Sequence, residues 1–247
     1  MLLPFGYFGN AIADAPYGAK TTPRDGWFIG SFFPEDDVRH DTRVSLRFSL
    51  LPRGTGREEM TRESDTSAMW YTIFRGVLEN VFQFPNRDEE RVVLYQPMDC
   101  ALVQSGHRHR WMVREECLVF MARWETSERK DQLIWTGNTG CIARDRVTNL
   151  MVGESVFPPR HPCCTDAIQI NAGRFKKGEE FPLKTGEEQG KKVVVLVSGG
   201  VEVISSTTEG RCIYTLSQKG DYHLLSDAGT TRMVNVVEDA YLITVAW

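Results

Sequence analysis

The stretch EECLVFMARW at residues 115–124 recurs at the end of the chain as EDAYLITVAW at residues 238–247. Both copies begin with two acidic residues, continue with an apolar run and end in tryptophan. The distance from residue 124 to residue 247 is 123 positions, and the same offset joins Gly76 to Gly199. Self-similarity at one fixed offset indicates a duplicated structural unit. The chain is therefore predicted to contain two copies of one fold.

Each copy is rich in strand-forming segments. Residues 44–50 (VSLRFSL) and 201–204 (VEVI) alternate apolar and polar side chains, which is typical of strands, and no long helical period is visible. The apolar runs that end at Gly76 and Gly199 predict hairpin turns, because glycine readily adopts positive φ. The predicted fold class is all-β.

Several motifs resemble the cupin superfamily. Residues 195–203 (VLVSGGVEV) are similar to a cupin hairpin, and residues 173–180 (GRFKKGEE) to the strand and turn that open a cupin barrel. Residues 220–222 (GDY) resemble the turn that starts the second cupin motif. Residues 106–111 (GHRHRW) resemble that motif's G-x-x-H-x-W ending. The resemblance implies two tandem cupin barrels (double-stranded β-helix, or jelly-roll) in one chain.

The repeat and the resemblance together predict the domain organisation. We expect an N-terminal arm at 1–20, a first barrel at 21–125, a connector at 126–146 and a second barrel at 147–247. Each barrel then has an ordinary domain size.

Composition and charge narrow the range of partners. The formal net charge is −4, so nothing favours nucleic-acid binding. The longest apolar run, 193–197, is far too short to span a membrane, and the first residues lack a signal-peptide pattern. We expect a cytoplasmic protein with a small-molecule ligand and no membrane or nucleic-acid partner. The sequence leaves open whether the protein forms a homo-oligomer.

A metal site follows only from the resemblance. Cupins hold a metal with an H-x-H pair and a glutamate from one motif and a histidine from the next. The matching positions in the first barrel are Glu63, Asp65, Met69 and His109, and His107 is available as a further ligand. Such a set could hold one divalent ion of iron, manganese, nickel, copper or zinc. The alternative is that the carboxylates lie on a solvated loop and the histidines are structural.

The second barrel lacks the pattern. Its matching positions are Gly186, Glu188, Lys192 and Arg232, so no metal is expected there.

The leading hypothesis is a cupin-type small-molecule enzyme, a metal-dependent oxygenase or isomerase, with its active site in the first barrel. The proposed catalytic residues are His109, Tyr71 and Glu63; the proposed substrate-binding residues are Arg47, Arg108, Trp70 and Trp111. Histidine can exchange protons near neutral pH, and arginine binds carboxylates through two parallel hydrogen bonds. A metal-independent acid–base enzyme and a non-catalytic binding or structural protein are the alternatives.

Overall fold

A computed structural model describes most of the chain. The described residues are 6–14, 26–62, 66–85, 88–104, 106–126, 134–138, 149–154, 157, 161–183, 190–207, 210–225 and 231–247. Their regular structure is entirely β-strand, which confirms the predicted fold class. No helix in this part of the chain has the length and apolar character that crossing a membrane requires.

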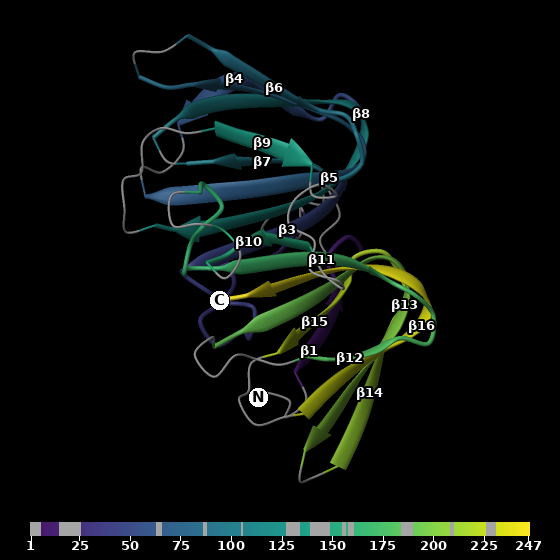
Figure 1. Ribbon diagram of the computed structural model, residues 1–247. Coiled ribbons are helices and arrows are strands. Elements are labelled where there is room, and N and C mark those ends of the chain that lie inside the picture. Colours follow the sequence, from purple (N-terminus) through teal and green to yellow (C-terminus); the bar gives the residue numbers. More distant parts are fainter. Residues whose placement is uncertain are drawn as a thin grey trace.

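The first sheet has eight strands and forms the upper half of the molecule in Figure 1. Its strands are β2 (Trp27–Ile29), β3 (Val44–Leu51), β4 (Gly56–Arg62), β5 (Ser67–Gln83), β6 (Glu90–Leu94), β7 (Asp99–Val103), β8 (Arg108–Glu125) and β9 (Ile134–Asn138). The order is β2-β3-β8-β5-β7-β9, with β4 added to β8 and β6 added to β5. The described pairings are antiparallel.

The second sheet repeats this arrangement. Its strands are β1 (Tyr7–Asn10), β10 (Asn149–Val152), β11 (Gln169–Phe175), β12 (Glu180–Pro182), β13 (Lys192–Thr207), β14 (Gly210–Leu216), β15 (Asp221–Leu225) and β16 (Thr231–Ala246). The order is β1-β15-β13-β16-β11-β10, with β12 added to β16 and β14 added to β13. Four strands of the first sheet thus occupy the same positions as four strands of the second: β3 corresponds to β11, β5 to β13, β7 to β15 and β8 to β16. Each half therefore forms a barrel with the same arrangement of these strands.

The outermost strands do not follow the predicted domain boundaries. Strand β9 lies within the stretch expected to be a connector, yet it pairs with β7 of the first sheet. Strand β1 lies in the expected N-terminal arm and pairs with β15 of the second sheet. Each of these strands covers a sheet edge that would otherwise expose unpaired backbone groups.

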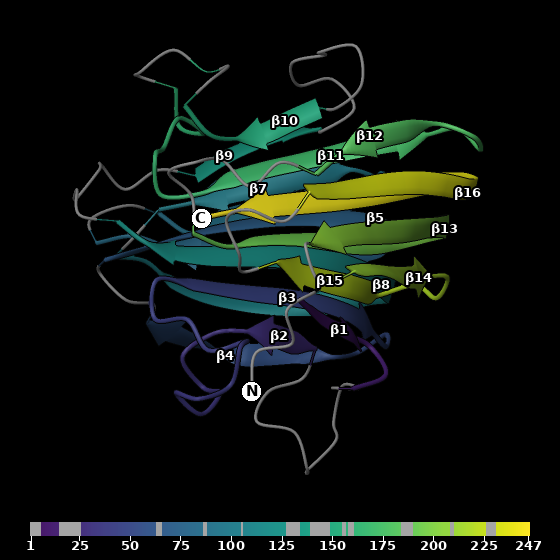
Figure 2. The ribbon, with the colours of Figure 1, turned by 90° about the horizontal axis from the view of Figure 1, so that it is seen from below.

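The two sheets pack against each other along one face: Figure 1 shows the second sheet below the first, and in the view from below in Figure 2 the two sets of strands overlap. The largest apolar core lies between them and draws residues such as Trp70 and Phe120 from the first sheet and Val195 and Ile243 from the second. Each barrel also has an interior core of its own. Four long strands take part in both kinds of core. One part of each packs in the core between the sheets, and the other part forms the wall of its own barrel; these strands are β5, β8, β13 and β16.

The two tryptophans of the sequence repeat occupy equivalent positions. Trp124 and Trp247 are both buried in the core between the sheets. The Nε1 atom of Trp247 donates a hydrogen bond to Oδ2 of Asp41 at 2.9 Å, and Lys191 forms an ion pair with the same carboxylate at 3.3 Å. The duplication inferred from the sequence is therefore reproduced in the packing.

The prediction of hairpins at Gly76 and Gly199 is wrong. Both glycines lie inside long strands, β5 and β13, at places where the register with β8 and β16 shifts. Both have φ of +88°, and a Cβ atom would collide with the carbonyl oxygen of Glu116 or Asp239 respectively. These bulges bend each strand without ending it, and Figure 1 displays the two bends on the same side of the molecule.

Candidate functional site

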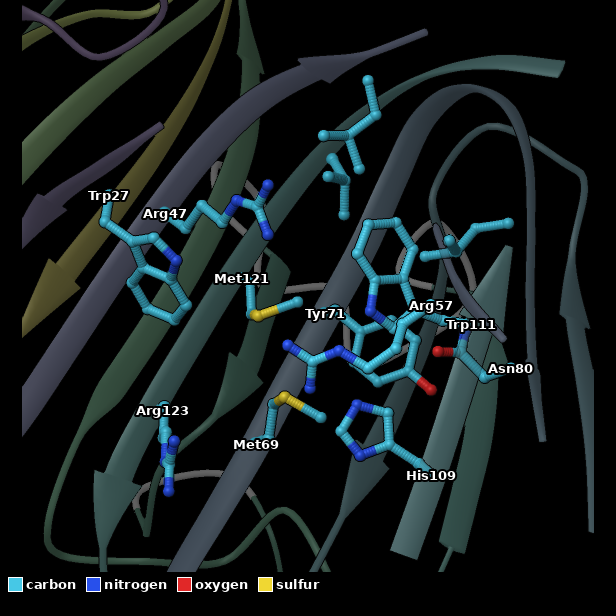
Figure 3. A pocket seen from close by; sticks show the side chains of 13 residues that line it. Trp27, Arg47, Arg57, Met69, Tyr71, Asn80, His109, Trp111, Met121 and Arg123 are labelled. Carbon is cyan, nitrogen blue, oxygen red and sulfur yellow. The ribbon is translucent and has the colours of Figure 1, made fainter. Parts of the chain in front are cut away.

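A cavity of about 190 Å³ opens inside the first barrel. It is lined by Trp27, Arg47, Leu51, Arg57, Met69, Tyr71, Leu78, Asn80, His109, Trp111, Val119, Met121 and Arg123. Figure 3 displays its polar and aromatic side chains from close by. Five strands contribute, so the site depends on the closed barrel and not on a single motif.

Strand β5 supplies the base of the cavity through alternate residues. Met69 and Tyr71 point into the barrel, and Trp70 between them points the opposite way. Trp70 is fully buried in the core between the sheets, where its ring stacks on Trp135 with centroids 5.9 Å apart. The predicted substrate contact of Trp70 is therefore corrected: because successive side chains of a strand face opposite sides, Trp70 and Tyr71 cannot both line the cavity.

Strand β8 follows the same rule. His109 and Trp111 line the cavity, as the sequence predicted for them. Arg108 precedes His109, so its exposed side chain points away, and its Nη2 donates to the carbonyl oxygen of Met60 at 3.4 Å. Arg108 is thus not placed to hold a substrate inside the barrel.

His107 is buried beside His109 but does not line the cavity. Its ring lies 5.4 Å from that of His109 and packs against Phe82 and Phe84 at 5.4 and 5.9 Å between centroids. Its Nδ1 lies 3.2 Å from the carbonyl oxygen of Gln104. These contacts give His107 a structural place in the aromatic wall behind His109.

Three arginines give the cavity its charge. Arg47 is buried, donates from Nε to the Ser49 hydroxyl at 2.9 Å and lies 5.9 Å from the ring centroid of Trp27. Arg57 is exposed at the rim, where its Nη1 donates to the Thr61 hydroxyl at 2.8 Å. Arg123 is half-buried. None of the described lining residues is a carboxylate, so the side chains around the cavity favour an anion.

Two buried polar groups point to a ligand. The hydroxyl of Tyr71 and the Nδ2 atom of Asn80 have no hydrogen-bond partner among the described residues, although both side chains are 5% exposed or less. Burying such a group without a partner costs about 1–3 kcal/mol. Burial also raises the pKa of Tyr71 well above its usual value, with the nearby Cys100 as a smaller cause, so the hydroxyl keeps its proton. Both groups can donate a hydrogen bond to an acceptor inside the cavity.

His109 is uncharged at neutral pH. Burial, and to a smaller extent the positive charges of Arg57 and Arg123, lower its pKa to about 4. In Figure 3, His109 lies toward the same end of the cavity as Tyr71 and Asn80, and Trp27 and Arg47 lie toward the other end. A neutral imidazole can both donate and accept a hydrogen bond.

The described lining does not fit a divalent metal. The predicted ligands Glu63 and Asp65 lie outside the described residues, and the matching position Met69 carries a thioether. No group of three histidine, cysteine, aspartate or glutamate side chains within the described ranges is arranged to hold a metal ion. The arginine charges that depress the pKa of His109 would also repel a cation. The chemistry of these side chains suits an anionic ligand better than a metal.

Several lining residues were not among the site residues proposed from the sequence: Trp27, Arg57, Asn80, Met121 and Arg123. Arg123 could have been found, because it alternates with Met121 and Val119 along one strand and faces the same side. Arg57 and Asn80 come from segments with no family motif, and only barrel closure brings them to the site.

Comparisons with known structures identify the fold. No protein-family model matches the chain, and no curated protein matches it in sequence. Among solved structures, Escherichia coli YhhW is similar with a TM-score of 0.60 and 11% identity over 85% of this chain and 86% of that chain. A cupin 2 conserved barrel domain protein from Leptotrichia buccalis has a TM-score of 0.51 and 14% identity over 83% and 84%. The chain has the two-barrel cupin fold.

The structural neighbours of this bicupin differ in what they bind. The formate complex of Lactobacillus farciminis oxalate decarboxylase aligns with a TM-score of 0.57 and 11% identity over 83% of this chain and 76% of that chain. YhhW, described as a bacterial pirin, has also been solved in complex with nickel(II). Bacillus subtilis oxalate decarboxylase has Mn(II) centres. At these identities the likeness establishes the fold alone, so the function of this bicupin must be argued from its own residues.

Proposed function

We propose that this bicupin binds a small organic carboxylate in its first barrel and that this cavity is its functional site. The observation that carries the proposal is the set of three arginines, Arg47, Arg57 and Arg123, around a cavity whose described lining contains no carboxylate. Arginine suits this task because its planar guanidinium matches the geometry of a carboxylate.

The size of the cavity limits the ligand. Drug-sized ligands occupy pockets of about 300–1,000 Å³, and this cavity is about 190 Å³. The proposed ligand is therefore a short mono- or dicarboxylate. Trp27, Trp111 and Met121 would contact its carbon chain (Figure 3).

The remaining polar groups would orient the ligand. The carboxylate would accept hydrogen bonds from arginine at one end. A second oxygen of the ligand would accept hydrogen bonds from the Tyr71 hydroxyl and the Asn80 amide, whose donors lack partners among the described residues.

A catalytic form of the proposal uses the same residues. His109, neutral because its pKa is about 4, would polarise a ligand carbonyl as a hydrogen-bond donor. The Arg47 guanidinium would stabilise negative charge that develops on the carboxylate side. One reaction that these groups could support without a redox partner is an isomerisation, in which the unprotonated ring nitrogen of His109 would accept a proton from one carbon of the ligand and return it to another carbon. The non-catalytic alternative is a carrier or sensor of the same carboxylate.

Calorimetric titration tests the proposal. Chelator-treated protein is titrated with a panel of short mono- and dicarboxylates, and at least one is expected to bind saturably without added metal. Arg123→Gln should weaken binding roughly tenfold, as expected for the loss of a charge-assisted hydrogen bond.

The matched control is Arg108→Gln, which removes the same charge from the outer side of β8 and should leave the affinity unchanged. Absence of binding across the panel, or equal weakening by both variants, would refute the carboxylate proposal. Proton NMR of the bound mixture then separates the two forms: an isomerised product identifies an enzyme, and an unchanged ligand identifies a binding protein.

A further inference from the structure

A second and larger cavity, of about 630 Å³, lies where the two barrels meet. It is lined by residues of both sheets, among them Phe74, Met98 and Leu118 from the first half and Val197 and Tyr241 from the second. It shares no lining residue with the cavity inside the first barrel.

The duplication itself creates this cavity. In the pairing of β5 with β8, Phe74 and Gly76 have no partner on β8, and in the pairing of β13 with β16, Val197 and Gly199 have none on β16. Phe74 and Val197 therefore belong to the two bulges that contain the positive-φ glycines. Phe74 and Val197 are related by the offset of the sequence repeat, as are Leu118 and Tyr241. The two bends leave a hollow between them, because each strand turns there from the shared core toward its own barrel.

The apolar wall of the cavity is aromatic. The rings of Phe74 and Tyr241 meet edge to face with centroids 5.5 Å apart, and both contribute to the lining. Met98 adds its side chain while its backbone holds φ at +75°, a conformation that costs a non-glycine residue energy. Its amide donates to the carbonyl oxygen of Ile73 at 2.7 Å, which fixes the strained turn against β5.

The charged rim is positive. Four basic residues line the cavity against one acidic residue, Asp239, which is already engaged by Lys176 at 2.8 Å. Arg75 is engaged by Glu116. Arg174 and Lys219 form no ion pair within the described part of the chain, and the Arg174 guanidinium lies 5.9 Å from the Tyr241 ring centroid. Among the described residues, these two cations have no counterion, and they lie beside an aromatic wall.

We propose that this inter-barrel cavity is a second ligand site, which takes an organic anion with a flat aromatic body. The aromatic body would pack against Phe74 and Tyr241, and its carboxylate or sulfonate would bind Arg174 and Lys219. The volume lies in the range of ordinary small-molecule pockets, whereas the first-barrel cavity is too small for such a ligand. The site is independent of the carboxylate proposed for the first barrel.

Anilinonaphthalene sulfonate, a fluorescent aromatic sulfonate, is a suitable probe. Titrated into the full-length protein, it is expected to bind saturably with one molecule per chain. Arg174→Gln combined with Lys219→Gln should weaken binding roughly tenfold, since both direct partners of the sulfonate are lost. Raising the salt concentration should weaken wild-type binding and have little effect on the double variant.

The matched control removes two exposed arginines elsewhere, with Arg53→Gln and Arg211→Gln together, and should leave the affinity unchanged. A second variant, Ser198→Phe, places a large side chain at an exposed lining position and should abolish binding by filling the cavity. If Ser198→Phe does not fold, the comparison of the two double charge variants is sufficient to test the proposal.

Three results would overturn the proposal. They are non-saturable fluorescence, equal weakening by the two charge-removal pairs, and full affinity in a folded Ser198→Phe protein. The two proposals can fail independently. Arg123→Gln should weaken carboxylate binding in the first barrel and leave the affinity for anilinonaphthalene sulfonate unchanged.

Discussion

The two barrels share a fold but have different interiors. Tyr71, Asn80 and Trp111 line the cavity of the first barrel, and the repeat offset places Val194, Val203 and Val234 at the same positions in the second. These valines are fully buried and pack in the second barrel's own core. One copy of the duplicated unit thus fills its interior with aliphatic side chains, and the other keeps a polar hollow.

The polar positions differ in a second way. Arg232 stands where the first barrel has His109, and Lys192 stands where it has Met69. Arg232 is 1% exposed, and burial lowers the pKa of Lys192. The two copies therefore share their strand arrangement and the core between the sheets, whereas the residues inside the barrels differ.

The largest expected effect concerns the core that both halves share. Trp124→Ala and Trp247→Ala should each lower the free energy of unfolding by about 3–5 kcal/mol, as is usual when a buried tryptophan is truncated. Trp247→Ala should cost slightly more, because Asp41 also loses a hydrogen bond. Chemical denaturation measures both. A small cost for either variant would break the equivalence of the two tryptophans.

The next effect is a dependence of stability on pH that arises in the first barrel. His109 has a folded pKa of about 4 against an ordinary value of 6.5, so the unfolded chain binds the proton more tightly. Stability is therefore fully present above pH 6.5 and falls, by up to about 3 kcal/mol, as the pH drops toward 4.

Denaturation midpoints between pH 4 and 7 test this, with His109→Gln as the comparison. The variant should lose that part of the pH dependence. An unchanged slope in His109→Gln would contradict the lowered pKa.

A smaller effect is expected at the two bulges. Gly76→Ala and Gly199→Ala should each lower the free energy of unfolding by more than Gly178→Ala does. All three glycines have φ near +88°, and this backbone strain alone costs about 1–2 kcal/mol. A Cβ at Gly178 meets nothing within 4 Å, but at the other two it collides with backbone. Equal costs for all three variants would show that the bulges tolerate a side chain.

The smallest effect isolates one hydroxyl. Tyr71→Phe should weaken carboxylate binding by about 0.5–1.5 kcal/mol, the usual net contribution of a hydrogen bond. It should leave the unfolding free energy unchanged or slightly higher, because the lost hydroxyl has no partner among the described residues. Calorimetry and denaturation of the same preparation measure the two effects. Lower stability with unchanged affinity would mean that the hydroxyl serves the fold and not the ligand.

The sequence predicted the overall architecture better than the site. The offset from Trp124 to Trp247 was sufficient to identify the duplication, because it marks the same buried position twice. It could not indicate which face of β5 is inward. Trp70 packs between the sheets and Tyr71 lies inside the barrel, so both faces of the strand are apolar and alternation carries no signal.

The remaining errors also have physical causes. A glycine with positive φ occurs both in hairpin turns and in β-bulges, so the sequence could not distinguish the two at Gly76. The register of β5 with β8 shows that Gly76 lies in a bulge. Arg57 was overlooked because barrel closure, and no local pattern, brings it near His109. The metal hypothesis depended on Glu63 and Asp65, which lie outside the described residues, and Arg57 and Arg123 argue against a cation beside His109.

Nitrogen NMR of the histidine rings tests whether the carboxylate binds inside the first barrel. With histidine labelled in the full-length protein, His109→Gln identifies the His109 signals, and His223→Gln identifies those of the histidine buried in the second half. Addition of the carboxylate that binds in calorimetry should shift the His109 signals and leave those of His223 in place. A shift of His223 without any shift of His109 at saturation would contradict the account.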